Sequence, residues 1–231
     1  FTLKNIYMKP LPELINTEDP GWNLVTEWLN EAKNIFEILP KTESRAESEL
    51  YYSQVTTRSP MGSIIYETGG ILIDKGWLRI LGSGHEKLDR GLMQWNLGKT
   101  FQKYGEQPGF LLIADDIIGG YFAINGGKLG TDIGTVYYLP QETLKWESLE
   151  IGYSDFIYWA LTGDINKFYE LFRWNTWKSD IELLNGNQSF SFYPFLLSGY
   201  EDLENRTRKI VSTEENYNFT LNIWNKMNSK L

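Results

Sequence analysis

The middle third of the chain contains three glycine-punctuated apolar stretches that decide its fold. They read GGILIDKGWLRILGSG (69–84), GFLLIADDIIGGYFAING (109–126) and GTVYYLPQETLKWESLEIGYSDFIYWAL (134–161). Short β-type runs separated by glycine-containing turns are typical of consecutive hairpins. The third stretch passes from a strand pattern into a helical pattern, and a sheet needs helices to cover it. We therefore predict an α+β fold in which an antiparallel meander sheet is covered by N-terminal and C-terminal helices.

Helical patterns precede this region. Asp19 and Pro20 match an N-cap followed by proline at the first helical position. The helical unit that follows is expected to stop at Pro40, and a second helix is expected over residues 43–54. Strand patterns are expected to begin at residues 64–66, where the hydrophobic period changes.

The C-terminal third is predicted to return to helices. FSFYPFL (190–196) predicts an edge strand or a buried extended segment, and the charged residues 201–208 predict a flexible linker. A capping-box pattern at Ser212 predicts the start of a last helix. We expect one α+β domain over residues 1–200, followed by a linker and a C-terminal helix over residues 201–231 that packs on it.

Composition narrows the classes of function. The 231 residues carry a net charge of −8 and include 9 Trp, 14 Tyr and 12 Phe, but no Cys. The absence of a basic run argues against nucleic acid and anionic membranes as partners. The absence of cysteine excludes disulfides and thiolate metal sites, and no apolar run reaches the roughly 18 residues of a membrane span. A basic protein partner, or a ligand bound through aromatic faces, is compatible with this composition.

The compartment is not fixed by the sequence. The chain opens with Phe1 rather than Met, so a leader that has been removed is compatible with it. We expect a cytoplasmic protein, and the oligomeric state is left open.

His85 and a pair of aspartates are the first candidates for chemistry. His85 is the one histidine, which excludes a multi-histidine metal site, and its glycine-rich surroundings indicate a loop. Asp115 and Asp116 directly follow an apolar strand. Successive strand residues point to opposite faces, so we expect the two carboxylates not to share one site. No metal ion and no cofactor are predicted.

A second candidate region surrounds the first hairpins. Arg79 lies between Leu78 and Ile80, and this alternation predicts that it occupies the solvated face of a strand. Together with tryptophans it would frame a ligand groove. The predicted ligand-binding residues are Trp77, Arg79, His85, Trp95 and Asp116.

These motifs carry a resemblance to known families. GGYFAI (119–124) and GYSDFIYWAL (152–161) resemble elements of the SUKH (Smi/Knr-like) superfamily. TRSPMGSIIYETGGILID (57–74) and WLRILGSGH (77–85) are similar to an uncharacterised bacterial family of unknown function, over roughly residues 11–200. The SUKH resemblance implies N-terminal helices before a meander sheet and a closing helix. It also implies binding, because members are largely immunity proteins that neutralise toxins, or regulatory scaffolds, and share no catalytic set.

Two classes of function follow. The first, which we favour, is a non-catalytic protein-binding module, immunity-like or scaffolding, with a basic toxin-like partner. The second is a carbohydrate-active enzyme or sugar-binding protein. It would use carboxylates beside aromatic walls, namely Glu67, Asp74, Asp115 or Asp116 beside Trp77 and Trp95. A structural role without any ligand also stays open.

Overall fold

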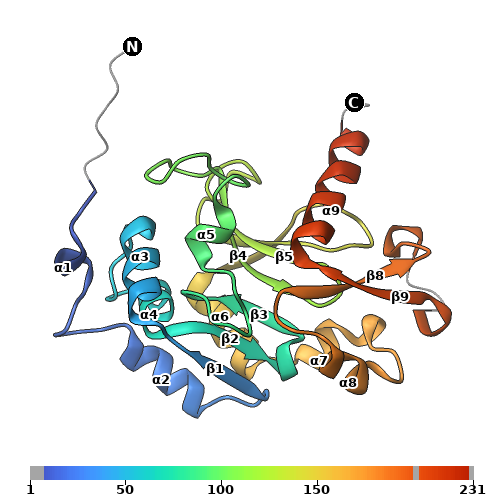
Figure 1. Ribbon diagram of the computed structural model, residues 1–231, viewed down its shortest axis with the longest axis horizontal. Helices are drawn as coiled ribbons and strands as arrows, with labels where there is room; N and C mark the ends of the chain where they lie inside the picture. The colour runs from blue at the N-terminus through green and yellow to red at the C-terminus, as the bar shows by residue number, and fades with distance from the viewer. Residues whose placement is uncertain (1–7, 200–202, 229–231) are drawn as a thin grey trace.

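The computed structural model describes residues 8–199 and 203–228. Its centre is a seven-stranded sheet in which the strands lie side by side in chain order (Figure 1). The strands are β1 (Phe36–Pro40), β2 (Thr68–Ile73), β3 (Leu78–Leu81), β4 (Phe110–Asp116), β5 (Tyr121–Asn125), β6 (Thr135–Leu139) and β7 (Glu147–Gly152). Each strand pairs antiparallel with the next one. The predicted antiparallel meander is confirmed.

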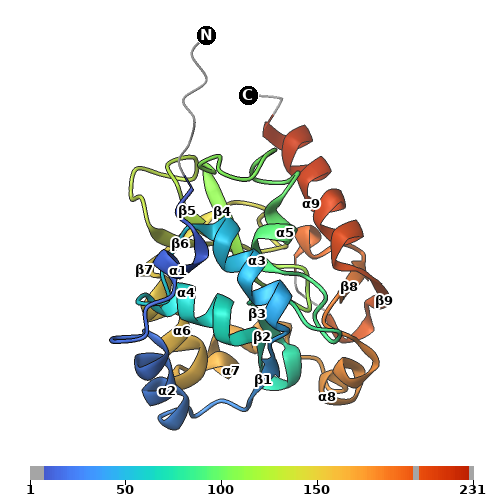
Figure 2. The ribbon, with the colours of Figure 1, turned by 60° about the vertical axis from the view of Figure 1, so that its left-hand side comes forward.

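Helices and a separate hairpin surround this sheet. The helices are α1 (Leu11–Leu14), α2 (Trp22–Asn30), α3 (Glu43–Ser53), α4 (Pro60–Glu67), α5 (Leu92–Asn96), α6 (Tyr153–Thr162), α7 (Ile165–Phe168), α8 (Trp177–Asp180) and α9 (Thr213–Asn228). The hairpin consists of β8 (Gln188–Tyr193) and β9 (Thr207–Ser212), which pair antiparallel. Figure 2 shows α2, α4 and α6 gathered on one side of the molecule, away from α9.

Neighbouring residues of β5 show how the two faces of the sheet are covered. The ring of Phe122 lies 5.0 Å from that of Phe156 in α6. The ring of Tyr121, the preceding residue, lies 5.0 Å from that of Tyr217 in α9. Because side chains alternate along a strand, these contacts place α6 on one face and α9 on the other. Both faces are therefore buried, and the core is rich in aromatic rings.

The turn between β4 and β5 fixes where α9 approaches the sheet. Gly119 has φ +91°, a left-handed conformation that favours glycine. A Cβ atom at this position would also lie 2.6 Å from Nδ2 of Asn216 in α9. Nδ2 of Asn216 donates to Oγ of Ser189 in β8 at 2.9 Å. The turn, the helix and the hairpin thus meet at one point.

The strand predicted at residues 64–66 is wrong, because α4 covers this segment. The Ser59 hydroxyl accepts a hydrogen bond from the Gly62 backbone N–H at 3.0 Å, and Pro60 occupies the first turn. Ile64 and Ile65 are fully buried on this helix. A short apolar run does not distinguish a buried helix from a buried strand, and here the cap decides.

The N-terminal helical unit also ends earlier than predicted. Helix α2 stops at Asn30, and the segment before Pro40 forms β1, in which Ile38 lies opposite Ile71 of β2. Pro40 ends this edge strand at a register shift, where its missing N–H breaks no ladder. The predicted helix over residues 43–54 is confirmed as α3. Strand β7 is not anticipated by the sequence pattern.

The C-terminal segment contains a strand that begins within the predicted linker. The extended segment predicted at 190–196 is confirmed up to Tyr193, where β8 ends. Strand β9 includes Thr207 and Arg208, which the sequence assigned to the linker, whereas residues 201–202 lie outside the described residues. The Ser212 hydroxyl accepts from the Glu215 backbone N–H at 3.0 Å, which confirms the predicted start of the last helix.

Candidate functional site

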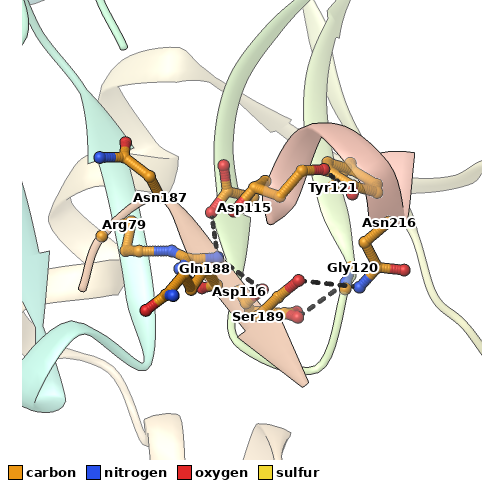
Figure 3. Close-up of polar contacts among 12 residues, drawn as sticks. Arg79, Asp115, Asp116, Gly120, Tyr121, Asn187, Gln188, Ser189 and Asn216 are labelled. Carbon is orange, nitrogen blue, oxygen red and sulfur yellow. Dashed lines mark hydrogen bonds and ion pairs between the residues drawn. The ribbon is translucent and has the colours of Figure 1, made fainter. Parts of the chain in front are cut away.

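Asp115 holds two arginine side chains between the sheet and the C-terminal hairpin. Arg79 lies opposite Asp115 in the register of β3 and β4, and its Nη2 is 2.6 Å from Asp115 Oδ1 (Figure 3). Arg90 forms a second ion pair with Asp115, with its Nη2 3.2 Å from Oδ1. Arg79 and Asp115 are each 1% exposed, so water does not screen their interaction. We call Arg79, Arg90 and Asp115 the buried triad.

The buried triad also binds the backbone that leads into β8. Arg79 Nη1 donates to the carbonyl of Gln188, and Arg90 Nη2 donates to the carbonyl of Gly186 at 2.8 Å. Burial lowers the pKa of Arg79, and the charge of Asp115 opposes this shift. The prediction that Arg79 lies on a solvated face is wrong, because the C-terminal segment covers it and Asp115 neutralises it. The triad fastens this segment to the sheet.

Asp116 lies on the opposite face of β4, as predicted from strand alternation. Its Oδ2 accepts hydrogen bonds from the hydroxyls of Tyr138 at 2.8 Å and Tyr169 at 3.1 Å. Its Oδ1 accepts the backbone N–H groups of Ile118 at 3.1 Å and Gly120 at 2.7 Å. Burial raises the pKa of Asp116, and these hydrogen bonds oppose the shift. This carboxylate shapes the β4–β5 turn.

Trp77 lies in an aromatic cluster rather than in a groove. It is fully buried, and its ring lies 5.5 Å from Tyr169 and 5.7 Å from Trp174. The guanidinium of Arg173 stacks on it at 3.7 Å and forms an ion pair with Asp74 at 2.6 Å. The cluster attaches the segment after α7 to the start of β3.

His85 and Trp95 lie elsewhere. His85 forms an isolated β-bridge with Leu88, and its Nδ1 accepts the Lys87 backbone N–H at 3.2 Å, in agreement with the predicted loop. Trp95 in α5 is buried, with the Arg90 guanidinium 4.6 Å and the Lys99 ammonium 4.1 Å from its ring. Both contacts are cation–π interactions.

The structure joins some of the predicted site residues and separates others. Arg79 donates to the Asp116 carbonyl at 3.0 Å, and Trp77 is linked to Asp116 through Tyr169. Arg79 lines a hollow of about 440 Å³, whereas Trp95 lines a different one of about 420 Å³. The oxygens of both aspartates are occupied by arginines, hydroxyls and N–H groups. In the described part of the chain no three His, Cys, Asp or Glu side chains come together as a metal site would require.

The most distinctive exposed feature is a group of apolar side chains at the end of β8 and on α9. Tyr193 is 71% exposed, Phe195 43%, Leu197 37% and Phe219 40%. The Phe195 ring lies 6.3 Å from Tyr193 and 4.9 Å from Phe219. We call these four residues the β8–α9 aromatic surface. The hollow beside Phe195, Leu197 and Phe219 measures only about 20 Å³, so the β8–α9 aromatic surface has almost no pocket.

Sequence reasoning did not single out this surface, although FSFYPFL contains a signal for it. Phe190 and Phe192 are buried, at 4% and 3% exposure, as alternate residues of a strand that packs on a core. Tyr193 follows Phe192 directly, so the same alternation places its side chain on the opposite, outward face. The predicted buried segment is thus buried only in part.

Within residues 8–199 and 203–228, no helix has both the length and the apolar character needed to cross a bilayer.

The chain belongs to a protein family described as "Protein of unknown function DUF2625", whose model matches residues 11–216. The predicted membership of a family of unknown function is confirmed. Two bacterial relatives align over most of their length. An uncharacterized protein of Haemophilus influenzae is 46% identical over 211 residues, which cover 91% of this chain and 92% of that protein.

The second relative is the putative uncharacterized protein YbfG of Escherichia coli. It is 48% identical over 208 residues, which cover 90% of this chain and 94% of that protein. No solved structure matches the chain significantly.

Proposed function

We propose that the protein is a non-catalytic binding module that docks a protein partner on the β8–α9 aromatic surface. The observation that carries the proposal is the contiguity of four large apolar side chains that each expose more than a third of their surface. Contiguous exposed apolar patches are a common mark of interaction sites. A hollow of about 20 Å³ does not enclose a small molecule, which favours a protein surface as the occupant.

The partner is expected to combine an apolar contact face with a basic overall charge. Tyr and Phe are enriched at the centres of protein interfaces, where they fill pockets of the partner. The net charge of −8 favours encounter with a cationic protein through the long-range field. An immunity-like or scaffolding role fits these properties.

A relationship to the SUKH superfamily is part of this proposal. Its support is the order of elements: helices α2 to α4 around a meander sheet, and α6 following β7 directly. Fold analogy alone is a weak argument for function, so the surface carries the proposal.

The alternative, a carbohydrate-active protein, has less support. Asp115 and Asp116 are each 1% exposed and lie on opposite faces of β4. Glu67 forms an ion pair with Lys41 at 3.2 Å, and Asp74 forms one with Arg173 at 2.6 Å. Carboxylate pairs that cut glycosidic bonds flank one open cleft, at separations of about 5 to 10 Å.

Site-specific photocross-linking in the native cells tests the docking surface. A photoreactive phenylalanine analogue replaces Tyr193 in one variant and Ile133, an exposed residue of the β5–β6 loop, in the control. We expect a cross-linked protein at position 193 and none of the same mass at position 133. Equal cross-linking at the two positions, or none at 193, would contradict the proposal.

Binding measurements with the purified partner then test whether these aromatic side chains contribute to the affinity. Isothermal titration is carried out with Phe195→Ser and Phe219→Ser, and with Ile133→Ser as the matched apolar-to-polar control. Because central aromatic residues carry most of the binding free energy, each of the first two variants is expected to bind about tenfold or more weakly. Binding of all three variants within about twofold of the parent would overturn the proposal.

A further inference from the structure

A second cavity lies on the other flank of α9 and has a different chemistry. It encloses about 460 Å³ between α9, the start of β4 and the loops that precede β6 and β7. Three lysines line it, Lys99, Lys128 and Lys145, each from a different segment. None of the described residues that line it carries a carboxylate. We call this cavity the basic pocket.

The charge of the basic pocket contrasts with the rest of the molecule. The chain has a net charge of −8, so a site lined by three ammonium groups departs from the overall balance. Lys99 is 2.9 Å from Glu214, which does not itself line the pocket. Lys128 and Lys145 are exposed, and among the described residues neither has an ion-pair partner within 4.0 Å. Their charges are available to an anionic ligand.

Aromatic side chains form the walls of the basic pocket. Phe110 and Trp146 pack with their ring centres 5.4 Å apart, and Tyr217 and Trp224 face them from α9. Such walls stack well on planar rings. The size of the pocket lies within the range of small-molecule sites, which runs from about 300 to 1,000 Å³.

Tyr217 lines the pocket from α9 as a buried residue. Tyr217 is 1% exposed, and its buried hydroxyl has no hydrogen-bond partner among the described residues. Because the hydroxyl oxygen is itself inaccessible, it is not among the groups that a ligand in the pocket would contact.

The basic pocket is separate from the β8–α9 aromatic surface. Tyr217 lines the pocket, whereas Phe219 belongs to the aromatic surface. Residues two positions apart on an α-helix are rotated by about 200°, so their side chains point in nearly opposite directions. The two sites therefore lie on opposite flanks of α9, and neither inference depends on the other.

We propose that the basic pocket binds a small anion that carries a planar aromatic ring. The ring packs against Phe110 and Trp146, and the anionic group lies near Lys128 and Lys145. The anionic group is a carboxylate or a phosphate, and the two are distinguished by the probes below.

Isothermal titration of the full chain uses two charged probes and their uncharged partners. Indole-3-carboxylate is compared with indole, and adenosine 5′-monophosphate with adenosine. We expect at least one charged probe to bind about tenfold more tightly than its partner, and to bind more weakly as salt is raised. Tighter binding of the first probe identifies a carboxylate site, and of the second a phosphate site. Failure of both charged probes to bind at about 10 mM, or equal binding of the uncharged partners, would overturn the proposal.

Lysine variants then test whether the charged probe binds in the basic pocket. The double variant Lys128→Met, Lys145→Met is compared with Lys103→Met, Lys167→Met, which removes two exposed lysines that do not line the pocket. The first pair is expected to lose about tenfold in affinity and the control to stay within about twofold. Equal affinity of the two double variants would contradict the assignment.

Discussion

Glu49 in α3 is a buried carboxylate at the first turn of α5. Its oxygens accept the backbone N–H groups of Met93 and Gln94, the latter at 3.3 Å. Burial raises the pKa of Glu49 from 4.5 to about 7, although these hydrogen bonds oppose the shift. Between these two pH values the folded chain holds a proton that the unfolded chain releases. This side chain therefore contributes stability at low pH that is lost as the pH rises from 4.5 to about 7.

Replacement of Glu49 by Gln is expected to remove this pH dependence. The free energy of unfolding of the parent should fall relative to Glu49→Gln between pH 5 and pH 8, by up to about 3 kcal/mol. Urea unfolding of the parent and of Glu49→Gln at pH 5 and at pH 8 measures this difference in the free energy of unfolding. Glu47→Gln, an exposed neighbour on α3, serves as control and should follow the parent. A Glu49→Gln variant that also follows the parent would refute the prediction.

Asp115 is the residue on which the buried triad depends. Asp115→Asn leaves Arg79 and Arg90 buried without a counter-charge, so we expect it to lower the free energy of unfolding by about 3–5 kcal/mol. Asp89→Asn removes the exposed partner of Arg45 and should cost less than about 1 kcal/mol. Urea unfolding compares the two, and equal losses would mean that the buried triad adds nothing to stability.

At the level of elements, the cap of α4 is a direct test of why this segment is helical. Ser59→Ala removes the acceptor of the Gly62 N–H and should lower the free energy of unfolding by about 1 kcal/mol. Ser59→Asp retains an acceptor and should recover most of this loss. Thermal unfolding of both variants provides the measurement. A loss that Asp does not reduce would point to packing around Ser59 instead of capping.

Local signals allowed the sequence to predict some elements and not others. Helix α9 has its cap at Ser212, and the aspartates at the end of β4 alternate between faces, so both features were predictable. The burial of Arg79 was not, because its covering segment lies more than 100 residues away at Gln188. The Ser59–Pro60 cap of α4 was present in the sequence, but the isoleucines that follow it also fit a strand. The buried Tyr217 hydroxyl, which has no hydrogen-bond partner among the described residues, is a property of packing that no sequence pattern shows.

For the whole molecule, the C-terminal hairpin and α9 are expected to unfold together with the sheet. We propose that residues 1–200 form one domain on which the rest of the chain packs. The contacts of Tyr121 with Tyr217 and of Arg79 with Gln188 support this proposal, since they join sheet, helix and hairpin through buried groups.

Coincident unfolding curves from two probes would show that α9 and the sheet unfold in one cooperative transition. Thermal unfolding followed by far-UV circular dichroism and by fluorescence of a dye attached to the cysteine of Phe219→Cys in α9, in a chain that has no other cysteine, should give the same midpoint. A helix signal that is lost well before the sheet signal would show that α9 is a separate unit.

The central claim concerns the exposed aromatic residues at the end of β8 and on α9. The ratio of dissociation constants for the purified partner, Phe195→Ser over Ile133→Ser, tests it most directly. A ratio of about ten or more is predicted, since Phe195 lies at the centre of the β8–α9 aromatic surface and Ile133 lies outside it. A ratio near one would contradict the claim that this surface is where the protein binds.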